Sequence, residues 1–358
     1  MQNVSKILVI RFSSMGDIVL TSPLIRVLRK AFPDSRIDFL VKEEFADLVK
    51  YNPHLSSVIT LKSGERDELT NLAKTLAASK YDLLFDLHNS LRSRYIRKYA
   101  YARSMRIVDK RVVRRFFLVN FKLNLYKEAA PVAERYLETA KDFGVKDDGK
   151  GLELFFPEVV GLAVSKRLAG FAPEGTGNII GIAPAAKHAT KRWLAERFIG
   201  YGVATHRERG SRFLVFGGNA DEEYCGDITA KINSAAGSAI AFNAAGKFSI
   251  LESAAAIDYC DLMVTNDTGI MHIASARGKK ILAIFGSTVK EFGFYPYRAE
   301  NVVLENPTLS CRPCSHIGLE KCPNGHFKCM ADITVADALG ATQTLLAGET
   351  LTGAKRNS

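Results

Sequence analysis

The stretch that decides the fold is Leu262-Met-Val-Thr-Asn266-Asp267-Thr268-Gly269-Ile-Met-His272. It predicts a short buried strand that ends in a polar turn and continues as a helix from Gly269. The same order of strand, turn and helix recurs along the chain, which is typical of βαβ units around a parallel sheet.

The expected elements form two series. In the first half we expect strands at residues 6–11, 36–41, 57–61, 81–86 and 104–108, with helices at 23–32, 67–79 and 91–101. In the second half we expect strands at 179–183, 213–216, 262–265 and 281–285, with helices at 193–206, 221–233, 250–259 and 269–276.

A polar stretch with Pro173, Gly175 and Gly177 separates the two series, and we interpret residues 171–178 as a linker. We therefore expect two doubly wound α/β domains, residues 1–172 and 173–330, followed by a C-terminal helix and tail at 331–358. In parallel α/β sheets ligands bind beyond the carboxyl ends of the strands, so the loops that follow strands are the candidate sites.

The composition excludes several classes of protein. The chain has 358 residues, of which 47% are hydrophobic, and this does not fit a disordered or fibrous protein. No apolar run approaches the roughly 20 residues that cross a bilayer, and no signal peptide opens the chain, so we expect a cytoplasmic protein. The formal net charge of +11 favours anionic partners: nucleotides, phosphorylated sugars, nucleic acid or an acidic membrane surface.

The first strand continues into the loop Phe12-Ser-Ser-Met-Gly-Asp17. Gly16 permits a close approach of the backbone to a ligand, and the small Ser13 offers a hydroxyl. Asp17 lies where the next helix begins, so its carboxylate either caps that helix or acts as a general base. Spacing alone favours the cap.

Two loops of the second half carry similar signals. Pro184-Ala-Ala-Lys-His-Ala-Thr-Lys191 places cationic side chains before a helix, which indicates either a diphosphate site or a solvated basic turn. Trp193 is the only tryptophan, and we interpret it as a helix-packing residue. Val215-Phe-Gly217-Gly218-Asn-Ala-Asp221 is half of a dinucleotide fingerprint, in which Asp221 is expected to cap a helix.

The strongest local pattern lies in residues 262–272. Asp267, the Thr268 hydroxyl and the free N–H groups of the following helix converge on one point, and His272 shares their helix face. This arrangement suits the phosphates and ribose of a nucleotide. The alternative is a capped helix with a core histidine.

Four cysteines lie close together near the C-terminus: Cys311, Cys314, Cys322 and Cys329. Zinc is one interpretation, but their spacing is not that of paired C-x₂-C knuckles. Free, buried thiols are the favoured interpretation.

The segment between Ser90 and Lys127 holds twelve Lys and Arg residues and one acidic residue, Asp109. Tyr and Phe side chains are interspersed with these cations. The segment is either a solvated helix face or a docking surface for a phosphorylated glycolipid at an anionic membrane, and its one-sided charge favours docking.

Together these motifs resemble glycosyltransferase family 9, the ADP-heptose:lipopolysaccharide heptosyltransferases. The matching segments are Arg11-Phe-Ser-Ser-Met-Gly-Asp17, Asp86-Leu-His-Asn-Ser-Leu-Arg92, Lys191-Arg-Trp193, Phe216-Gly-Gly218, Asn266-Asp-Thr-Gly-Ile-Met-His272 and Phe285-Gly286. The cysteine-rich segment is similar to one found particularly in the second-heptosyltransferase type. Where the family often has Pro-Gly-Ala, this chain has Pro184-Ala-Ala186.

The resemblance implies the GT-B fold, in which two Rossmann-like domains face each other across a cleft. Asp17 matches the family's proposed catalytic base, and Lys191 matches the lysine that contacts the donor diphosphate. Donor binding is assigned to Ser13, Gly16, Thr190, Lys191, Gly217, Gly218, Asp267, Thr268, Gly269 and His272. Acceptor binding is assigned to His88, Asn89, Arg92 and Arg94.

The resulting hypothesis is an inverting, metal-independent enzyme that needs no cofactor. It transfers a heptose from ADP-heptose to the inner core of a lipid-anchored lipopolysaccharide precursor, on the cytoplasmic face of the inner membrane. A transferase with another nucleotide sugar is the main alternative. A nucleic-acid-binding protein and a Rossmann oxidoreductase are remote, because the chain has neither a nucleic-acid recognition motif nor an intact G-x-G-x-x-G.

Overall fold

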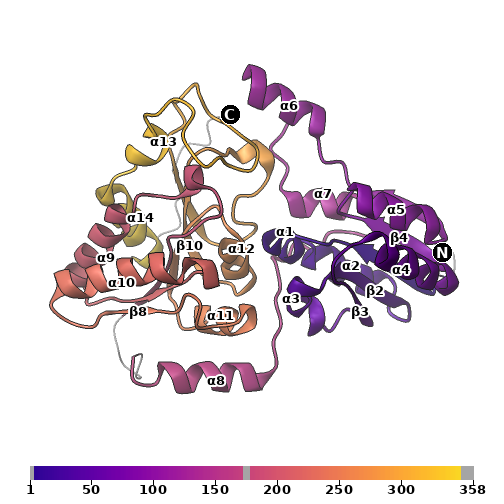
Figure 1. The fold of residues 1–358 in the computed structure, drawn as a ribbon, viewed down its shortest axis with the longest axis horizontal. Coiled ribbons are helices and arrows are strands. Elements are labelled where there is room, and N and C mark those ends of the chain that lie inside the picture. Colours follow the sequence, from indigo (N-terminus) through magenta and orange to yellow (C-terminus); the bar gives the residue numbers. More distant parts are fainter. Residues whose placement is uncertain (1–3, 172–177, 348–358) are drawn as a thin grey trace. The chain divides into compact units, whose positions relative to one another are not determined.

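The computed structural model describes residues 4–171 and 178–347 (Figure 1). The chain divides into two compact units. The first consists of the residues up to Val112 together with Ala130–Pro157, and the second of Val113–Ala129 and the residues from Glu158 onward. These contact boundaries do not coincide with the predicted boundary between residues 172 and 173. The core of the predicted linker, 172–177, and the predicted tail, 348–358, lie outside the described residues.

The first unit is built on a parallel five-stranded sheet with the strand order β3-β2-β1-β4-β5. The strands are β1 (Lys6–Ile10), β2 (Arg36–Lys42), β3 (Ser57–Leu61), β4 (Tyr81–Asp86) and β5 (Ala102–Ile107). The helices are α1 (Met15–Val19), α2 (Ser22–Ala31), α3 (Asp47–Lys50), α4 (Arg66–Ser79), α5 (Leu91–Tyr99) and α7 (Val132–Glu138). Strand β1 is apolar and buried from Ile7 to Ile10 because a central parallel strand is covered on both faces.

The second unit is built on a parallel six-stranded sheet with the order β11-β10-β9-β6-β7-β8. The strands are β6 (Ile179–Ala183), β7 (Arg212–Val215), β8 (Ala241–Asn243), β9 (Leu262–Asn266), β10 (Lys280–Phe285) and β11 (Asn301–Glu305). The helices are α8 (Glu158–Leu168), α9 (Ala195–Arg209), α10 (Glu222–Ala236), α11 (Ile250–Ile257), α12 (Gly269–Ala276), α13 (Lys328–Ala331) and α14 (Val335–Ala347). Helix α6 spans Val112–Phe121. Val112 belongs to the first unit, and the rest of the helix belongs to the second.

Both sheets reverse their strand order at one point. In the first unit the reversal lies between β1 and β4, and in the second between β6 and β9. The loops that leave the two strands on either side of such a reversal diverge and leave a crevice, where α/β proteins bind their ligands. The topology therefore selects four loops: those after β1, β4, β6 and β9.

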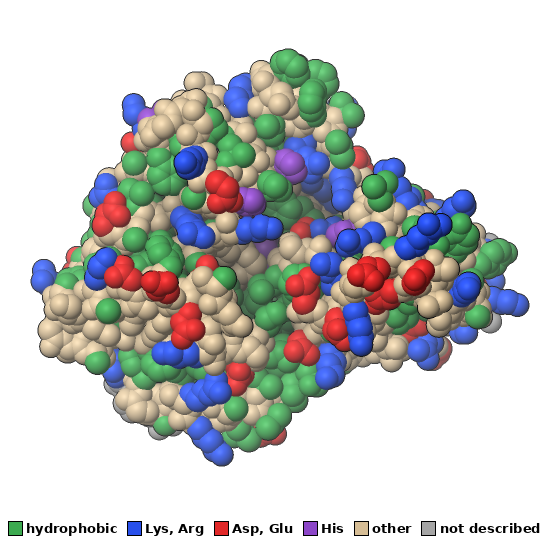
Figure 2. Space-filling model, in the orientation of Figure 1, with side chains coloured by type: hydrophobic (Ala, Val, Ile, Leu, Met, Phe, Trp, Pro, Cys, Tyr) green, Lys and Arg blue, Asp and Glu red, His purple; other side chains and the backbone are tan. Residues whose placement is uncertain are grey.

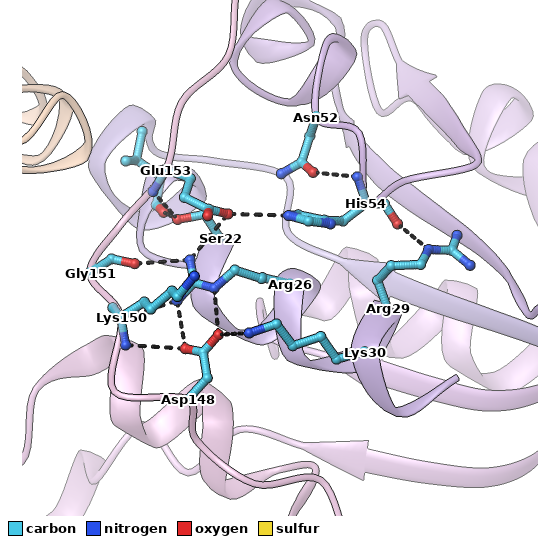
Figure 3. Close-up of polar contacts among 11 residues, drawn as sticks. Ser22, Arg26, Arg29, Lys30, Asn52, His54, Asp148, Lys150, Gly151 and Glu153 are labelled. Carbon is cyan, nitrogen blue, oxygen red and sulfur yellow. Dashed lines mark hydrogen bonds and ion pairs between the residues drawn. The ribbon is translucent and has the colours of Figure 1, made fainter. Parts of the chain in front are cut away.

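A buried ion-pair network attaches the returning segment of the first unit to α2 (Figure 3). Arg26 donates from Nε and Nη2 to the two carboxylate oxygens of Asp148, both at 2.9 Å, and its Nη1 lies 3.1 Å from Glu153 Oε2. Lys30 also pairs with Asp148. Donation from Arg26, opposed by burial and aided by Lys30, holds the pKa of the Asp148 carboxyl below its usual value. The network thus fixes residues 148–153 to the first unit.

The fold prediction is confirmed as two doubly wound parallel α/β units. Each predicted strand and helix has a counterpart, with ends that differ by a few residues. The helix that was expected to begin at Asp17 is α1, although no bounds were given for it. The elements β8, β11, α3, α6, α7, α8 and α13 were not predicted. Most of these are short, and their formation depends on neighbours rather than on an apolar period of their own. Helix α14 is the helix that was expected within 331–358.

Candidate active site

In the first unit, Asp17 lies in the first turn of α1, just beyond the carboxyl end of β1. Ser14 is the N-cap of that helix, and it donates to Asp17 Oδ2 from its hydroxyl at 2.8 Å and from its backbone N–H at 3.4 Å. This is a capping box, so the capping interpretation of Asp17 is confirmed. Ser13 and Gly16 flank the carboxylate in the same turn and belong to the first unit.

A second set of groups holds the other oxygen of Asp17. Arg11 Nη2 lies 2.7 Å from Asp17 Oδ1, and the Tyr136 hydroxyl donates to the same oxygen at 3.4 Å. Arg11 Nη1 donates to the Leu87 carbonyl at 2.6 Å, which links the loops after β1 and β4. Burial is the largest single influence on the pKa of Arg11 and lowers it, but Asp17, Tyr136 and Asp86 together outweigh burial, and the net shift is upward. The Arg11 guanidinium and the hydroxyl groups of Ser14 and Tyr136 therefore orient the carboxylate. The Asp17 side chain is 16% exposed.

The sequence analysis gave no role to Arg11 or Tyr136. Arg11 was visible as a charged residue at the end of an apolar strand, which is a signal for a site. Tyr136 comes from α7, more than a hundred residues away, and no local pattern could have joined it to Asp17.

The loop after β4 is organised by Asp86, which is fully buried. Its Oδ1 accepts the backbone N–H groups of His88 and Asn89 at 3.0 and 2.7 Å, and its Oδ2 accepts Arg97 Nη1 at 2.8 Å. The His88 ring packs on Phe12 with centroids 5.0 Å apart. Burial, reinforced by the charges of Arg11 and Lys110, lowers the pKa of His88 to about 3, so its imidazole is neutral at physiological pH.

The predicted acceptor residues therefore separate into two pairs. His88 and Asn89 lie in the loop beside Arg11 and Asp17. Arg92 and Arg94 are exposed on α5, where the Arg92 side chain lies against Gly64. Within the described residues, neither arginine forms a hydrogen bond or ion pair with Asp17, Arg11 or Tyr136.

In the second unit, Lys191 and Asp267 form an ion pair at the point where the strand order reverses. Lys191 Nζ lies 2.6 Å from Asp267 Oδ2, and their side chains are 15% and 7% exposed. The same oxygen accepts the Thr288 hydroxyl at 2.8 Å. Lys191 comes from the loop after β6, Asp267 from the end of β9 and Thr288 from the end of β10. The sequence analysis placed Lys191 and Asp267 in one donor site only through the family resemblance; the ion pair brings the two side chains together, while their contact with a donor stays a prediction. Thr288 was missed.

Asn266 attaches the loop that carries Lys191, called here the lysine loop (residues 184–193), to β9. Its fully buried amide accepts the Trp193 backbone N–H at 3.0 Å and donates to the Pro184 carbonyl at 2.8 Å. Trp193 is buried and donates from its indole to the Ile333 carbonyl at 3.0 Å, so the packing interpretation of this residue is confirmed. The position of Lys191 therefore depends on both ends of its loop being attached to the sheet.

Thr190 uses its hydroxyl inside the protein. It donates to Ser287 Oγ at 3.1 Å and accepts the Leu319 N–H at 2.8 Å. A Cβ at Gly286 would lie 2.8 Å from the Thr190 carbonyl, which explains the absence of a side chain there. Thr190 thus attaches the lysine loop to Ser287 and Leu319. Its contact with a donor stays a prediction.

Helix α12 begins beside the Lys191–Asp267 pair. Thr268 is its N-cap residue, and Gly269 is its first residue. The N–H groups of a first helical turn have no partner within the helix and favour anions. His272 is buried, with its ring 6.3 Å from that of Phe294. A lysine, a helix N-terminus and hydroxyl groups at one sheet edge are suited to a diphosphate.

Gly217 and Gly218 follow β7, which neighbours β6. A Cβ at Gly217 would lie 2.9 Å from both the Asp221 Cβ and the Cys225 Sγ. The Gly218 N–H donates to Asp221 Oδ2 at 3.0 Å, which closes a capping box on the 3₁₀ turn Asn219–Asp221. Asp221 is also the N-cap residue of α10, but its side chain makes no capping hydrogen bond to that helix, so the predicted cap is present by position only. Close packing and capping thus account for this turn, and its contact with a donor stays a prediction.

The four C-terminal cysteines are free thiols. Cys311 Sγ lies 3.9 Å from His326 Nε2, and Cys314 donates to the Cys311 carbonyl at 3.5 Å. Burial and the neighbouring thiols raise the pKa of Cys329 to about 11. In residues 4–171 and 178–347, no group of three or more His, Cys, Asp or Glu side chains is placed to hold a metal ion. The zinc interpretation therefore has no geometric support.

These observations define an α/β protein of two doubly wound units, in which the second unit brings a lysine, an aspartate and a helix N-terminus together at its switch point. A sequence profile described as glycosyltransferase family 9 (heptosyltransferase) matches residues 69–324, and the chain belongs to this family. It is therefore a glycosyltransferase, and the predicted family is confirmed.

Individual relatives agree with this assignment. The chain is 28% identical over 336 residues to lipooligosaccharide heptosyltransferase 2 of Campylobacter jejuni, covering 93% of this chain and 95% of the relative. A family 9 glycosyltransferase structure from Veillonella parvula matches with a TM-score of 0.81 at 25% identity, covering 98% and 99% of the two chains. The structure of E. coli ADP-heptose LPS heptosyltransferase II matches with a TM-score of 0.73 at 26% identity, covering 96% and 99%.

Proposed function

We propose that this chain transfers a heptose from ADP-heptose to the inner core of a lipopolysaccharide precursor, with inversion at the anomeric carbon and without a metal ion. The observation that carries the proposal is the Lys191–Asp267 pair at the switch point of the second unit, beside the N-terminus of α12. The names of the relatives, which include an ADP-heptose heptosyltransferase, supply the donor and the acceptor class.

The second unit binds the donor in this proposal. The ammonium of Lys191 moves from Asp267 to the diphosphate, and the free N–H groups of α12 bind the same anion. Asp267 retains the Thr288 hydroxyl as a partner while Lys191 is engaged. Lys191 and α12 then stabilise the negative charge that grows on the departing ADP, which is the largest electrostatic demand of the reaction.

The first unit supplies the base in this proposal. Asp17 accepts the proton of an acceptor hydroxyl as that oxygen forms a bond to the anomeric carbon and the bond from that carbon to ADP breaks. A single displacement of this kind inverts the anomeric centre. Arg11, Tyr136 and Ser14 fix the orientation of the carboxylate. The neutral His88 and Asn89 lie in the adjoining loop, where they are available to position the acceptor.

Two sequence features support a reaction without a metal. The chain contains no Asp-x-Asp, the pair of carboxylates by which many sugar transferases bind a divalent ion to the donor diphosphate. Lys191 and the α12 N–H groups offer the positive charge that such an ion otherwise supplies.

We also propose that the enzyme works at the cytoplasmic face of the inner membrane, because its acceptor is anchored there by lipid. None of the helices in residues 4–171 and 178–347 is long and apolar enough to span a bilayer. The net charge of +11 favours an anionic surface.

The test is transfer by the purified full chain to a de-O-acylated inner-core acceptor, with ADP-heptose, ADP-glucose, UDP-glucose and GDP-mannose compared in the presence and absence of EDTA. We expect a heptosylated product from ADP-heptose alone, with the anomeric configuration opposite to that of the donor and no loss in EDTA. Transfer only from another nucleotide sugar would establish the alternative donor, and a product that retains the donor's configuration would remove Asp17 as a simple base.

A further inference from the structure

Helix α6 exposes apolar side chains that a helix of a globular protein normally buries. Val112, Val113, Phe116 and Phe121 are 54%, 66%, 53% and 64% exposed. Leu118 is its one buried side chain. The segment that follows continues the pattern with exposed Leu123 and Leu125. Figure 2 shows hydrophobic side chains on the surface at the place where Figure 1 labels α6.

Three phenylalanines in this helix form a cluster. The ring centroids of Phe116, Phe117 and Phe121 lie 5.7–5.9 Å from one another. Aromatic rings in such contact fix each other's orientation. An exposed and contiguous apolar patch of this kind marks an interaction surface.

The residues that follow α6 are attached to the rest of the second unit. Lys122 Nζ donates to the Pro313 carbonyl at 2.7 Å, and Asn124 Nδ2 donates to Glu291 Oε1 at 3.1 Å. The pKa of His316 is lowered first by burial and then by the charge of Arg115, which places Arg115 near the same loop. The C-terminal end of α6 is thus anchored to the second unit, while its apolar side chains stay exposed.

The charge around the helix is cationic. Arg114, Arg115, Lys122 and Lys127 lie in or just after α6, and residues 110–127 contain no acidic side chain. Other cations of the basic stretch are neutralised within the first unit, where Arg97, Arg103 and Arg106 pair with Asp86, Asp82 and Asp142. Arg92, Arg94 and Lys98 on α5 are further exposed cations of the stretch, but only the cations of residues 110–127 lie next to the exposed phenylalanines in the sequence.

We propose that α6 and residues 122–127 dock on an anionic lipid bilayer, with Phe116, Phe121 and their apolar neighbours inserted among the headgroups. A ten-residue helix is about 15 Å long, which is too short to cross a bilayer and suits a helix that lies in its interface. Charge complementarity selects the occupant, since a neutral partner would not need the flanking cations. The inference rests on the proposed function in one respect: a lipid-anchored acceptor requires the enzyme to work at such a surface.

The test measures binding of the full chain to vesicles of phosphatidylcholine with or without phosphatidylglycerol. We expect binding to the anionic vesicles that weakens as salt rises. Phe116→Ser/Phe121→Ser should reduce the partition coefficient about tenfold for each ring that is fully inserted. Arg114→Gln/Lys127→Gln should reduce it about fivefold for each charge near the surface.

Matched controls come from the same unit. Val159 and Leu162 on α8 are 66% and 56% exposed, so Val159→Ser/Leu162→Ser removes similar apolar exposure elsewhere and should leave vesicle binding unchanged. Arg207→Gln removes an exposed cation of α9 and should do the same. In Phe116→Trp the new indole should show a blue shift with anionic vesicles, while Trp193 is buried in both states.

Each outcome decides the matter. The inference is overturned if the phenylalanine variant binds vesicles as tightly as the wild type. It is also overturned if only the charge variant loses binding, because that would mean surface attraction without insertion. A phenylalanine variant that changes only the oligomeric state in lipid-free solution would assign α6 to self-association instead. Transfer to a de-O-acylated acceptor should be unchanged in this variant. If the chain binds vesicles through α6 but transfers no heptose, the proposed function fails and the present inference stands.

Discussion

The substitution Lys191→Met tests the donor site most directly. It removes the ammonium and keeps most of the apolar stem. A hydrogen bond to a charged group contributes about 1.5–3 kcal/mol, which corresponds to an increase of roughly 10- to 150-fold in the Kd for ADP. The same change removes the cation beside Asp267, which keeps its hydrogen bond from the Thr288 hydroxyl. Breaking a buried ion pair costs about 3–5 kcal/mol, and the partial exposure of Lys191 places the loss of stability at or below the lower end.

The assay is calorimetric titration of the full chain with ADP, combined with denaturant unfolding. The double variant Lys191→Met/Asp267→Asn removes both charges, so it should regain most of the lost stability while ADP binding stays weak. Lys187→Met is the matched control, because Lys187 is an exposed cation of the same loop. If Lys191→Met binds ADP with the wild-type Kd, the phosphate-binding role of Lys191 is refuted. The same conclusion holds if the double variant regains both stability and affinity.

Three further predictions follow from the first unit. Asp17→Asn should lower kcat by about 10²–10⁴-fold and leave the Kd for ADP unchanged, because the base is lost and the donor groups are not touched; kcat near the wild-type value would contradict the assignment. Arg26→Ala should lower the free energy of unfolding by about 3–5 kcal/mol, since Asp148 and Glu153 lose a buried partner; a loss below 1 kcal/mol in denaturant titration would argue against the network. The pKa of His88 is about 3 in the folded state, so as the pH falls the unfolded chain binds a proton at His88 before the folded chain does, and the free energy of unfolding decreases below about pH 6.5. His88→Gln should therefore show a smaller decrease between pH 7 and 5. An equal decrease would contradict the lowered pKa.

The sequence by itself determined the two parallel sheets and the positions of most helices. Short β-branched runs and apolar helical periods are local signals, and they gave the strands around Asp267 and Asp17 with ends correct to a few residues. The capping role of Asp17 was equally local, because the N-cap Ser14 and its partner Asp17 lie three residues apart. The motifs also indicated Lys191 and Asp267 as residues of one site.

Only the tertiary structure decided which distant groups meet these residues. Tyr136 reaches Asp17 from α7, and Thr288 reaches Asp267 from the end of β10, since strand order and helix packing bring together positions that no spacing relates. The basic stretch shows the same limit. Its charges looked alike in the sequence, but Arg97 is neutralised by a buried aspartate and α6 turns its phenylalanines to solvent. Whether a charge or a ring is available depends on what lies opposite it in space, and that is fixed by the fold.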